Sequence, residues 1–331
     1  MKQLIDSLQR GKVLDQWNFL KDYKLISLDG TEFFSSKTVH CESCCQKQHK
    51  DGSIRYHHQM VVGSIVNPYE KQVFPIGFEP VTKEDGADKN DCEHNATKRW
   101  LIQYRKDHPQ LETVIVADGL FSDEPFISSL KEHRCHFIIV AKEGDHKYLY
   151  EWFFEATAPD IETLEYRDKE GHHRYRWMKD VPLNEMHHDR CKVNVLYYQN
   201  EYKGKNRQWL WVTDLKITQD NVFELMKGGR ARWKIENETF NTLKNQGFNF
   251  EHNYGHGTKT LSNFLAGLML LAFMVDQISF ALNKAFQACY MTLKRIYRLW
   301  KDIFNQIYNF TVLSWDDLYQ SLCPDIDPLT G

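Results

Sequence analysis

Residues 24–30 read Lys-Leu-Ile-Ser-Leu-Asp-Gly, a short apolar run that closes on the carboxylate of Asp29. A second run over residues 113–118, Thr-Val-Ile-Val-Ala-Asp, repeats the pattern and ends in Asp118. Continuous apolar runs of this length are typical of strands buried on both faces of a sheet. A carboxylate at the end of such a strand is costly unless it is paired, hydrogen-bonded or bound to a cation. Because glycine follows each aspartate, a turn or capping role is the alternative interpretation of either one alone.

The segments around these two runs predict a mixed α/β fold. Two β-like runs, residues 60–66 and 72–78, follow the first strand, and a helix is predicted from an N-cap at Asn90. After Asp118 the pattern indicates another helix and then a buried strand over residues 136–141. The order is therefore strand, strand, strand, helix, strand, helix, strand.

Further along, the pattern changes from buried runs to alternation. Within residues 144–215, the runs 165–177, 191–199 and 208–213 alternate between apolar and polar positions, with turn signals such as 169–171 and 203–206, which predicts an antiparallel β insertion. Helical patterns resume near Asp220 and dominate after Leu261. The predicted organisation is a helical N-terminal remnant (1–23), a first core part (24–143), the β-rich insertion (144–215), a second core part (216–275) and a helical C-terminal tail (276–331).

The composition excludes several classes of protein. The 331 residues carry 42 Lys and Arg against 45 Asp and Glu, a formal net charge of −3, and 42% of them are hydrophobic. A disordered chain and a polycation that grips nucleic acid by bulk charge are both excluded. Eight cysteines are too few for a disulfide scaffold, and no signal peptide is evident at the start. The longest apolar run, residues 264–275, is shorter than the roughly 20 residues of a bilayer span. We expect a cytoplasmic protein with no membrane contact and a buried helix at this run.

A third acidic position lies in the stretch Gly-Gly-Arg-Ala-Arg-Trp-Lys-Ile-Glu-Asn-Glu-Thr-Phe, residues 228–240. Arg232 and Glu236 are spaced i, i+4 on a predicted helix, in a segment rich in lysine and arginine. A solvated surface ion pair is the plain alternative for such a spacing.

With this third element the chain resembles the transposases of bacterial insertion sequences, the Asp-Asp-Glu class built on a ribonuclease-H-like fold. The resemblance covers roughly residues 24–275. It implies a mixed sheet flanked by helices, with one Asp on the first strand, a second at the fourth strand, and a Glu on a helix after a β-rich insertion. Asp29, Asp118 and Glu236 occupy these three places in the predicted order.

The subgroup carries a Tyr-x2-Arg-x3-Glu-x6-Lys signature around its glutamate, and this chain matches it in part. Arg232 and Glu236 fit the central Arg-x3-Glu, whereas the tyrosine position is Gly229 and the lysine position is Leu243. The nearest lysine, Lys244, is one residue further on, which is about 100° around a helix. Glu238 therefore stays open as an alternative acid, and so does an inactive copy.

The resemblance implies a metal-dependent DNA strand-transfer enzyme. Cutting a phosphodiester in line requires activation of the attacking oxygen and stabilisation of the leaving oxygen, which two divalent ions about 4 Å apart supply. Mg²⁺ or Mn²⁺ prefers oxygen ligands, so we expect Asp29 and Asp118 as the principal metal ligands and Glu236 to complete the second metal. Arg232 would hold a phosphate beside the scissile bond.

The expected partner is double-stranded DNA, both transposon ends and target, bound by a homodimer. Lys244 is a candidate DNA contact. Trp209 and Trp211 alternate on one face of the insertion, and Trp211 is a candidate for stacking on a flipped base, although paired tryptophans in a β domain are usually core. A basic cluster in the C-terminal tail, Lys294, Arg295, Arg298 and Lys301, is the other candidate DNA surface.

A polar Cys/His-rich stretch follows the first strand. Cys41, Cys44, Cys45 and His49 form a Cys-x2-Cys-Cys-x3-His pattern that could hold a structural Zn²⁺, and His57 and His58 follow it. Reduced thiols in a polar loop are the alternative, because no second Cys-x2-Cys completes a closed set. Cys92 and His94 are more distant candidates.

A second functional hypothesis belongs to a different class: a truncated or inactive transposase remnant that only binds DNA. Only 28 residues precede Asp29, too few for a separate end-recognition domain, so we expect weak or non-specific DNA binding by this chain alone.

Overall fold

The strand that carries Asp29 is much longer than its apolar run. Strand β2 (Tyr23–Ser36) continues for seven residues beyond Asp29, pairing antiparallel with β4 (Ile54–Val66) and parallel with β6 (Thr113–Ala117). Asp29 is therefore a mid-strand residue, which excludes the turn interpretation for it. Gly30 pairs with Val61 in the same strand, and a Cβ atom at this position would lie 2.9 Å from the carboxylate of Glu93, so a larger side chain would be crowded.

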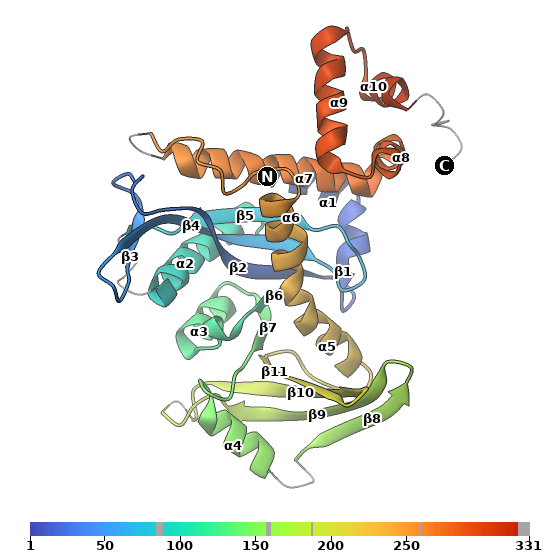
Figure 1. Ribbon diagram of the computed structural model, residues 1–331. Coiled ribbons are helices and arrows are strands. Elements are labelled where there is room, and N and C mark those ends of the chain that lie inside the picture. Colours follow the sequence, from blue (N-terminus) through green and yellow to red (C-terminus); the bar gives the residue numbers. More distant parts are fainter. Residues whose placement is uncertain (84–88, 157–159, 187, 258–259, 324–331) are drawn as a thin grey trace.

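The computed structural model describes residues 1–83, 89–156, 160–186, 188–257 and 260–323 (Figure 1). For residues 89–92 only the backbone is described, so the predicted cap at Asn90 and the thiol of Cys92 lie outside the described side chains. Helix α2 (Lys89–Asp107) occupies the predicted place.

One mixed sheet of 11 strands runs through the molecule. Its hydrogen-bonded path is β3-β4-β2-β6-β7-β11-β10-β9-β8, with β5 paired to β4 and β1 to β2. The predicted insertion therefore extends the core sheet, because β11 pairs antiparallel with β7 at Trp211–Val140. The strands not yet bounded are β1 (Asn18–Phe19), β3 (Cys45–Gln48), β5 (Phe74–Pro80), β7 (His136–Val140), β8 (Glu162–Asp168), β9 (Gly171–Pro182), β10 (Lys192–Tyr202) and β11 (Lys205–Thr213).

Helices cover both faces of this sheet, and each face has its own hydrophobic core. Alternate residues of β2 divide between the cores: Ile26 and Leu28 face one, and Leu25 faces the other. The first core contains α1 (Lys2–Arg10), α2, α3 (Glu124–Glu132) and α4 (Lys147–Glu155). The second contains α5 (Val222–Arg230), α6 (Asn241–Asn245) and α7 (Leu261–Leu282). Asp29, in phase with Leu25, points to the second core.

Between α5 and α6 the chain forms a nearly continuous helical column. A short 3₁₀ turn (Ala231–Trp233) and a π-helical turn (Ile235–Phe240) join the two helices. The column passes in front of the sheet from the insertion toward α7 (Figure 1). It brings the predicted Glu236 segment against β2.

Helix α7 fills the place of the predicted buried helix, but one of its faces is open. Ala266, Leu270 and Phe273 are buried, and Gly267 packs on Phe78 of β5. Other apolar residues of α7 are exposed, among them Phe264, Leu268, Val275 and Leu282. Of the described helices, α7 is the one whose length and composition would allow a membrane span.

The C-terminal helices α8 (Lys284–Leu293), α9 (Ile296–Asn309) and α10 (Trp315–Leu322) form a small core of their own. Helix α9 projects away from the sheet (Figure 1). The mixed α/β fold, with a large sheet flanked by helices and a helical C-terminal region, confirms the fold predicted from the sequence.

Candidate carboxylate site

The sheet brings Asp29 and Asp118 together. The parallel pairing of β2 and β6 extends to Ser27 and Val116, which lie two residues before each aspartate. Asp29 Oδ1 accepts the N–H of Gly30 at 2.8 Å. Asp118 caps a 3₁₀ turn (Gly119–Phe121), where its Oδ1 accepts the N–H of Leu120 at 3.0 Å. The capping interpretation of Asp118 is therefore correct in geometry, and its second oxygen remains available for another partner.

Glu236 reaches the same place from the helical column. Ser27 Oγ donates to the carbonyl oxygen of Arg232 at 2.8 Å, which fixes the column to β2 two residues from Asp29. Arg232 Nη1 lies 2.7 Å from Glu236 Oε1 and 3.5 Å from Asp29 Oδ2. The i, i+4 pair is therefore only partly a surface pair: the guanidinium also reaches the buried strand, while the Glu236 side chain is half exposed.

The pKa of Asp29 reflects both its burial and the other carboxylates around it. The pKa of Asp29 is raised to about 7, chiefly by burial and in addition by the nearby carboxylates of Glu236 and Asp118, while Arg232 opposes the shift. Two carboxylates therefore act on Asp29, and the Arg232 guanidinium lies between Asp29 and Glu236. Such a cluster favours a bound cation.

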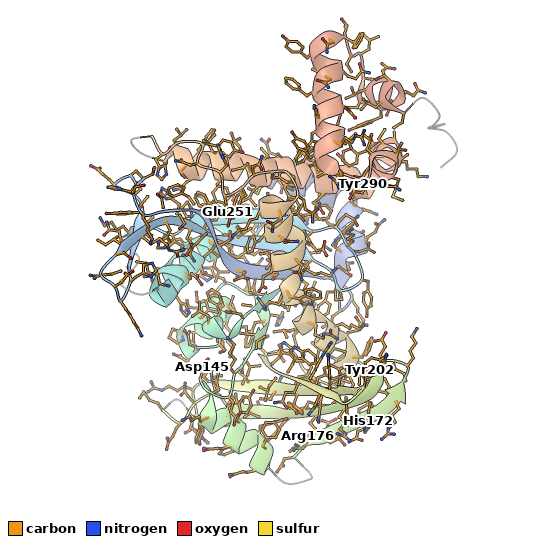
Figure 2. The ribbon with its side chains drawn as sticks, in the orientation of Figure 1. Asp145, His172, Arg176, Tyr202, Glu251 and Tyr290 are labelled. Atoms are coloured by element: carbon orange, nitrogen blue, oxygen red, sulfur yellow. The ribbon has the colours of Figure 1, made fainter. Side chains whose placement is uncertain are left out.

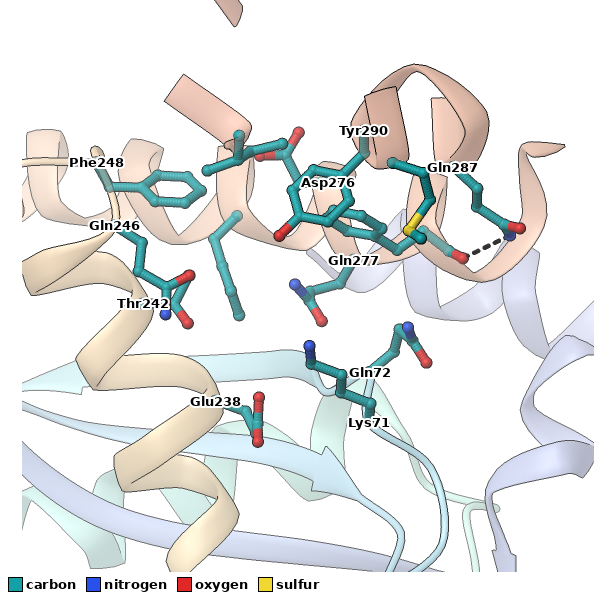
Figure 3. A pocket seen from close by; sticks show the side chains of 14 residues that line it. Lys71, Gln72, Glu238, Thr242, Gln246, Phe248, Asp276, Gln277, Gln287 and Tyr290 are labelled. Atoms are coloured by element: carbon teal, nitrogen blue, oxygen red, sulfur yellow. Dashed lines mark hydrogen bonds between the residues drawn. The ribbon is translucent and has the colours of Figure 1, made fainter. Parts of the chain in front are cut away.

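The π-helical turn selects which acid faces this cluster. Its residues Ile235 and Thr239 are buried, and Thr239 Oγ1 lies 3.5 Å from Ser64 Oγ of β4. Glu238 lines a different cavity of about 530 Å³ between the column, α7 and α8, near Lys71 (Figure 3). The geometry favours Glu236 over the alternative acid.

A tryptophan explains why the signature tyrosine is missing. A Cβ atom on Gly229 would lie 2.6 Å from the indole of Trp211, so a side chain at 229 meets this ring. Trp211 is 1% exposed and stacks parallel to Trp209, with ring centroids 6.4 Å apart. The prediction that Trp211 stacks on a DNA base is contradicted, because its ring fills the core between β11 and α5.

Lys244 has a partner within the chain. Its Nζ lies 2.9 Å from Glu251 Oε1, on the segment that leaves α6 (Glu251 is labelled in Figure 2). Contact of Lys244 with a phosphate would require exchange of this ion pair. Its role on DNA stays a prediction.

Lys142 is a cation near the site that the sequence pattern did not single out. A Cβ atom on Gly119 would lie 3.2–3.3 Å from the aliphatic carbons of Lys142, so the lysine stem passes beside the Asp118 turn. Lys142 follows β7, the strand parallel to β6, and the ends of neighbouring parallel strands meet at one sheet edge. The position of Lys142 just after a predicted buried strand is the sequence feature that could have identified it.

A second cluster of potential ligands lies beside the far half of β2, where His58 of β4 pairs with Phe34. Cys41, Cys44, His58 and His256 each offer one atom, and these atoms lie within 4.8 Å of one another. The predicted ligand set was half wrong. Cys45 Sγ points instead toward the carbonyl oxygen of Val81.

His49, the other misassigned ligand, is exposed in the turn between β3 and β4. His58 follows the cysteines in the sequence but lies outside the Cys-x2-Cys-Cys-x3-His pattern. His256 lies 212 residues from Cys44, so only the fold brings it to this cluster.

Comparison with known proteins identifies the family. The family described as "Transposase DDE domain" matches residues 22–274, and the chain belongs to it, as the carboxylate pattern predicted. The comparison with curated proteins found no match. Among solved structures the chain is similar to a piggyBac transposase in a synaptic complex with hairpin DNA, with 10% identity and a TM-score of 0.42. The match covers 91% of this chain and 52% of that one, so the chain spans about half the length of that transposase.

Proposed function

We propose that this chain cuts DNA at transposon ends and joins the freed 3′-hydroxyl to target DNA. The observation that carries the proposal is the convergence of Asp29, Asp118 and Glu236 from two parallel strands and the helical column. Membership of the DDE transposase family supports the same chemistry.

The donor set fits hard divalent cations. Asp29 and Asp118 would hold Mg²⁺ or Mn²⁺ through the oxygens not used for backbone hydrogen bonds, and Glu236 would complete a second position. Bound ions of this kind activate the attacking oxygen and stabilise the leaving oxygen. The raised pKa of Asp29 fits this role, since a divalent cation would offset both the cost of burying its charge and the repulsion from the neighbouring carboxylates.

The residues of this chain then position the DNA. Arg232 would bind a phosphate beside the scissile bond, because its guanidinium already faces both Asp29 and Glu236. Lys142 would approach from the Asp118 side, and Lys244 from the end of the column. These basic side chains would bind the phosphates of the DNA around the carboxylates that hold the metal ions.

The insertion offers a basic surface next to the start of the column. A cavity of about 420 Å³ there is lined by both basic and aromatic side chains. Arg230 lies with its guanidinium 5.0 Å from the ring centre of Trp209, which is half-buried and more accessible than Trp211. We propose this surface for double-stranded DNA. Its basic members are Lys169, Lys203, Lys205, Arg207 and Arg230.

We further propose that the DNA complex is a homodimer and that the protein works in the cytoplasm. Exposed aromatic residues on and after α9 offer a surface for a second copy: Tyr297, Phe304, Tyr308 and Phe310. The mass of the chain with and without DNA, measured by light scattering, tests the dimer. A single copy in the DNA complex would contradict it.

The carboxylate assignment is tested by nicking of supercoiled DNA carrying candidate terminal repeats, with Mg²⁺ or Mn²⁺. Asp29→Asn should lower the rate by more than about 100-fold, because metal stabilisation of the transition state is worth several kcal/mol. Asp276→Asn is the matched control, since Asp276 is also a buried aspartate with a pKa raised to about 7 but lies on α7. Equal loss in both variants, or none in Asp29→Asn, contradicts the assignment.

The alternative, a DNA-binding remnant without catalysis, predicts a different result. The folded wild-type chain would bind DNA but neither nick it nor form joined products in the presence of either metal. No feature of the described residues favours this alternative.

A further inference from the structure

The Cys/His cluster joins three parts of the chain that are distant in sequence. Cys41 and Cys44 lie between β2 and β3, His58 lies on β4, and His256 lies between α6 and α7. The two sulfurs are 3.8 Å apart, which is too far for a disulfide. Cys44 and His58 are buried, and the other two side chains are partly buried.

Five of the six separations between the ligand atoms are close to the edges of a tetrahedron around one zinc ion, and the sixth, from Cys41 to His256, is within 4.8 Å. With Zn–S of about 2.3 Å and Zn–N of about 2.0–2.1 Å, a tetrahedral site has edges of about 3.8 Å (S–S), 3.6 Å (S–N) and 3.3 Å (N–N). Here Cys41 Sγ and Cys44 Sγ are 3.8 Å apart, and each lies 3.4 Å from His58 Nε2. His256 Nδ1 lies 3.7 Å from Cys44 Sγ and 3.3 Å from His58 Nε2.

The surrounding chain is built to present these four atoms. Gly255 and Gly257 flank His256 with φ of +105° and +62°, a backbone region that favours glycine. Phe34 packs edge-on against His256 at 4.2 Å between ring centres, and Phe33 stacks on His58 at 5.7 Å. Both imidazoles are therefore held in place by β2 itself.

We propose that Cys41, Cys44, His58 and His256 bind one structural Zn²⁺ in a closed tetrahedral site. Two thiolates and two neutral imidazoles balance the charge of the ion, and binding releases the two thiol protons to solvent. Four protein ligands leave no open position for substrate, so the site is separate in chemistry from the carboxylate cluster.

A zinc ion at this site would link the sheet to the segment that follows the helical column. Phe250, on that segment, packs 5.7 Å from Phe33 between ring centres, and His256 fixes its far end. Zinc would therefore hold residues 246–257 against β2 and set where α7 begins. Removal of the ion should loosen the end of this segment around His256 first, because residues 251–254 are exposed whereas Phe248 and Phe250 are buried.

Metal content of the full chain tests the proposal without reference to activity. We expect one zinc per purified chain by elemental analysis. With Co²⁺ instead, the chain should show the visible absorption of a tetrahedral thiolate site. His256→Ala, on a partly buried loop, and Cys44→Ser should each lower the metal affinity at least about tenfold.

Two neighbouring residues provide matched controls. Cys45→Ser and His49→Ala change the same residue types within a few positions but outside the cluster, and both should keep zinc at the wild-type affinity. Absence of zinc together with no tetrahedral Co²⁺ spectrum in the wild type overturns the proposal. Equal affinity in all four variants overturns it as well.

A folding measurement covers the case in which Cys44→Ser does not fold. A strong chelator should lower the unfolding temperature of wild type and Cys45→Ser, and should not change that of His256→Ala. A chelator effect of the same size in His256→Ala would contradict the ligand set. Loss of nicking in Asp29→Asn bears only on the proposed function and leaves this site untouched.

Discussion

At the scale of single residues, Gly229 and Trp211 illustrate how a departure from a family pattern can be compensated. Glycine occupies position 229, where the signature has tyrosine, and the indole of Trp211 on β11 lies against it. Gly229→Ala should lower the free energy of unfolding by about 1–3 kcal/mol, because the added methyl group overpacks this contact. Chemical denaturation measures the change.

Gly144→Ala is the control for that substitution, since a Cβ atom at 144 would meet nothing within 4 Å. Trp211→Phe combined with Gly229→Ala should recover part of the loss, because the smaller ring vacates the contact. If Gly229→Ala were as stable as wild type, close packing could not explain the missing tyrosine.

Site residues could be predicted from the sequence where a recognisable pattern surrounds them, and not where their partners are distant in the chain. Asp29 and Asp118 are predictable because each follows an apolar run, and Glu236 because Arg232 lies four residues before it. His256 carries no such context, since its partners are supplied by a strand and a loop about 200 residues earlier. Cys45 and His49 were chosen by proximity in sequence. Strand β3 begins at Cys45 and directs its thiol away from that of Cys44.

At the scale of elements, Asp276 sits at the contact between α7 and α9. Burial raises its pKa to about 7, although Trp300 Nε1 on α9 donates to its Oδ1 at 3.3 Å. Because the folded chain holds this proton up to about pH 7 while an unfolded aspartate loses it near pH 4, stability falls as pH rises between these values. The slope from this group is at most about 1.4 kcal/mol per pH unit.

Asp276→Asn should remove that slope while keeping a hydrogen-bond acceptor for Trp300. Unfolding midpoints between pH 4 and 8 provide the measurement, and the variant should be the more stable protein at pH 8. Asp317→Asn, an exposed aspartate on α10, is the control and should follow the wild-type curve. A wild-type curve that rises from pH 4 to 7 in parallel with the variant would contradict the assignment to Asp276.

Element types were predictable from apolar periodicity, but their lengths were not. Strand β2 extends to Ser36 because β4 pairs with it from Leu25 to Ser36, a tertiary contact that cannot be read from the apolar run ending at Asp29. The pairing of β7 with β11, which extends the sheet, could not be predicted either. Alternation indicates that a segment is a strand but does not indicate which strand it pairs with.

At the scale of the whole molecule, a net charge of −3 must be reconciled with DNA binding. Basic side chains nevertheless gather in two local patches. One is the cavity of the insertion that Lys203, Arg207 and Arg230 help to line, and the other is on α9, where Arg298 and Lys301 are exposed. The insertion surface adjoins the column that carries Arg232 and Glu236, whereas α9 projects away from the sheet (Figure 1). A single duplex that reaches the carboxylates therefore meets the insertion surface before α9.

Arg207→Ala should consequently weaken binding to any duplex and reduce the slope of log affinity against log salt by about 0.9, the value of one phosphate contact. Lys301→Ala on α9 removes an equal charge and should change neither quantity. Fluorescence anisotropy across a salt series, with Mg²⁺ replaced by Ca²⁺ to slow cleavage, separates the two surfaces. The reverse pattern, in which Lys301→Ala weakens binding and Arg207→Ala does not, would move the DNA path onto the C-terminal helices. It would then require a second copy of the chain, since α9 of one copy lies far from its own insertion.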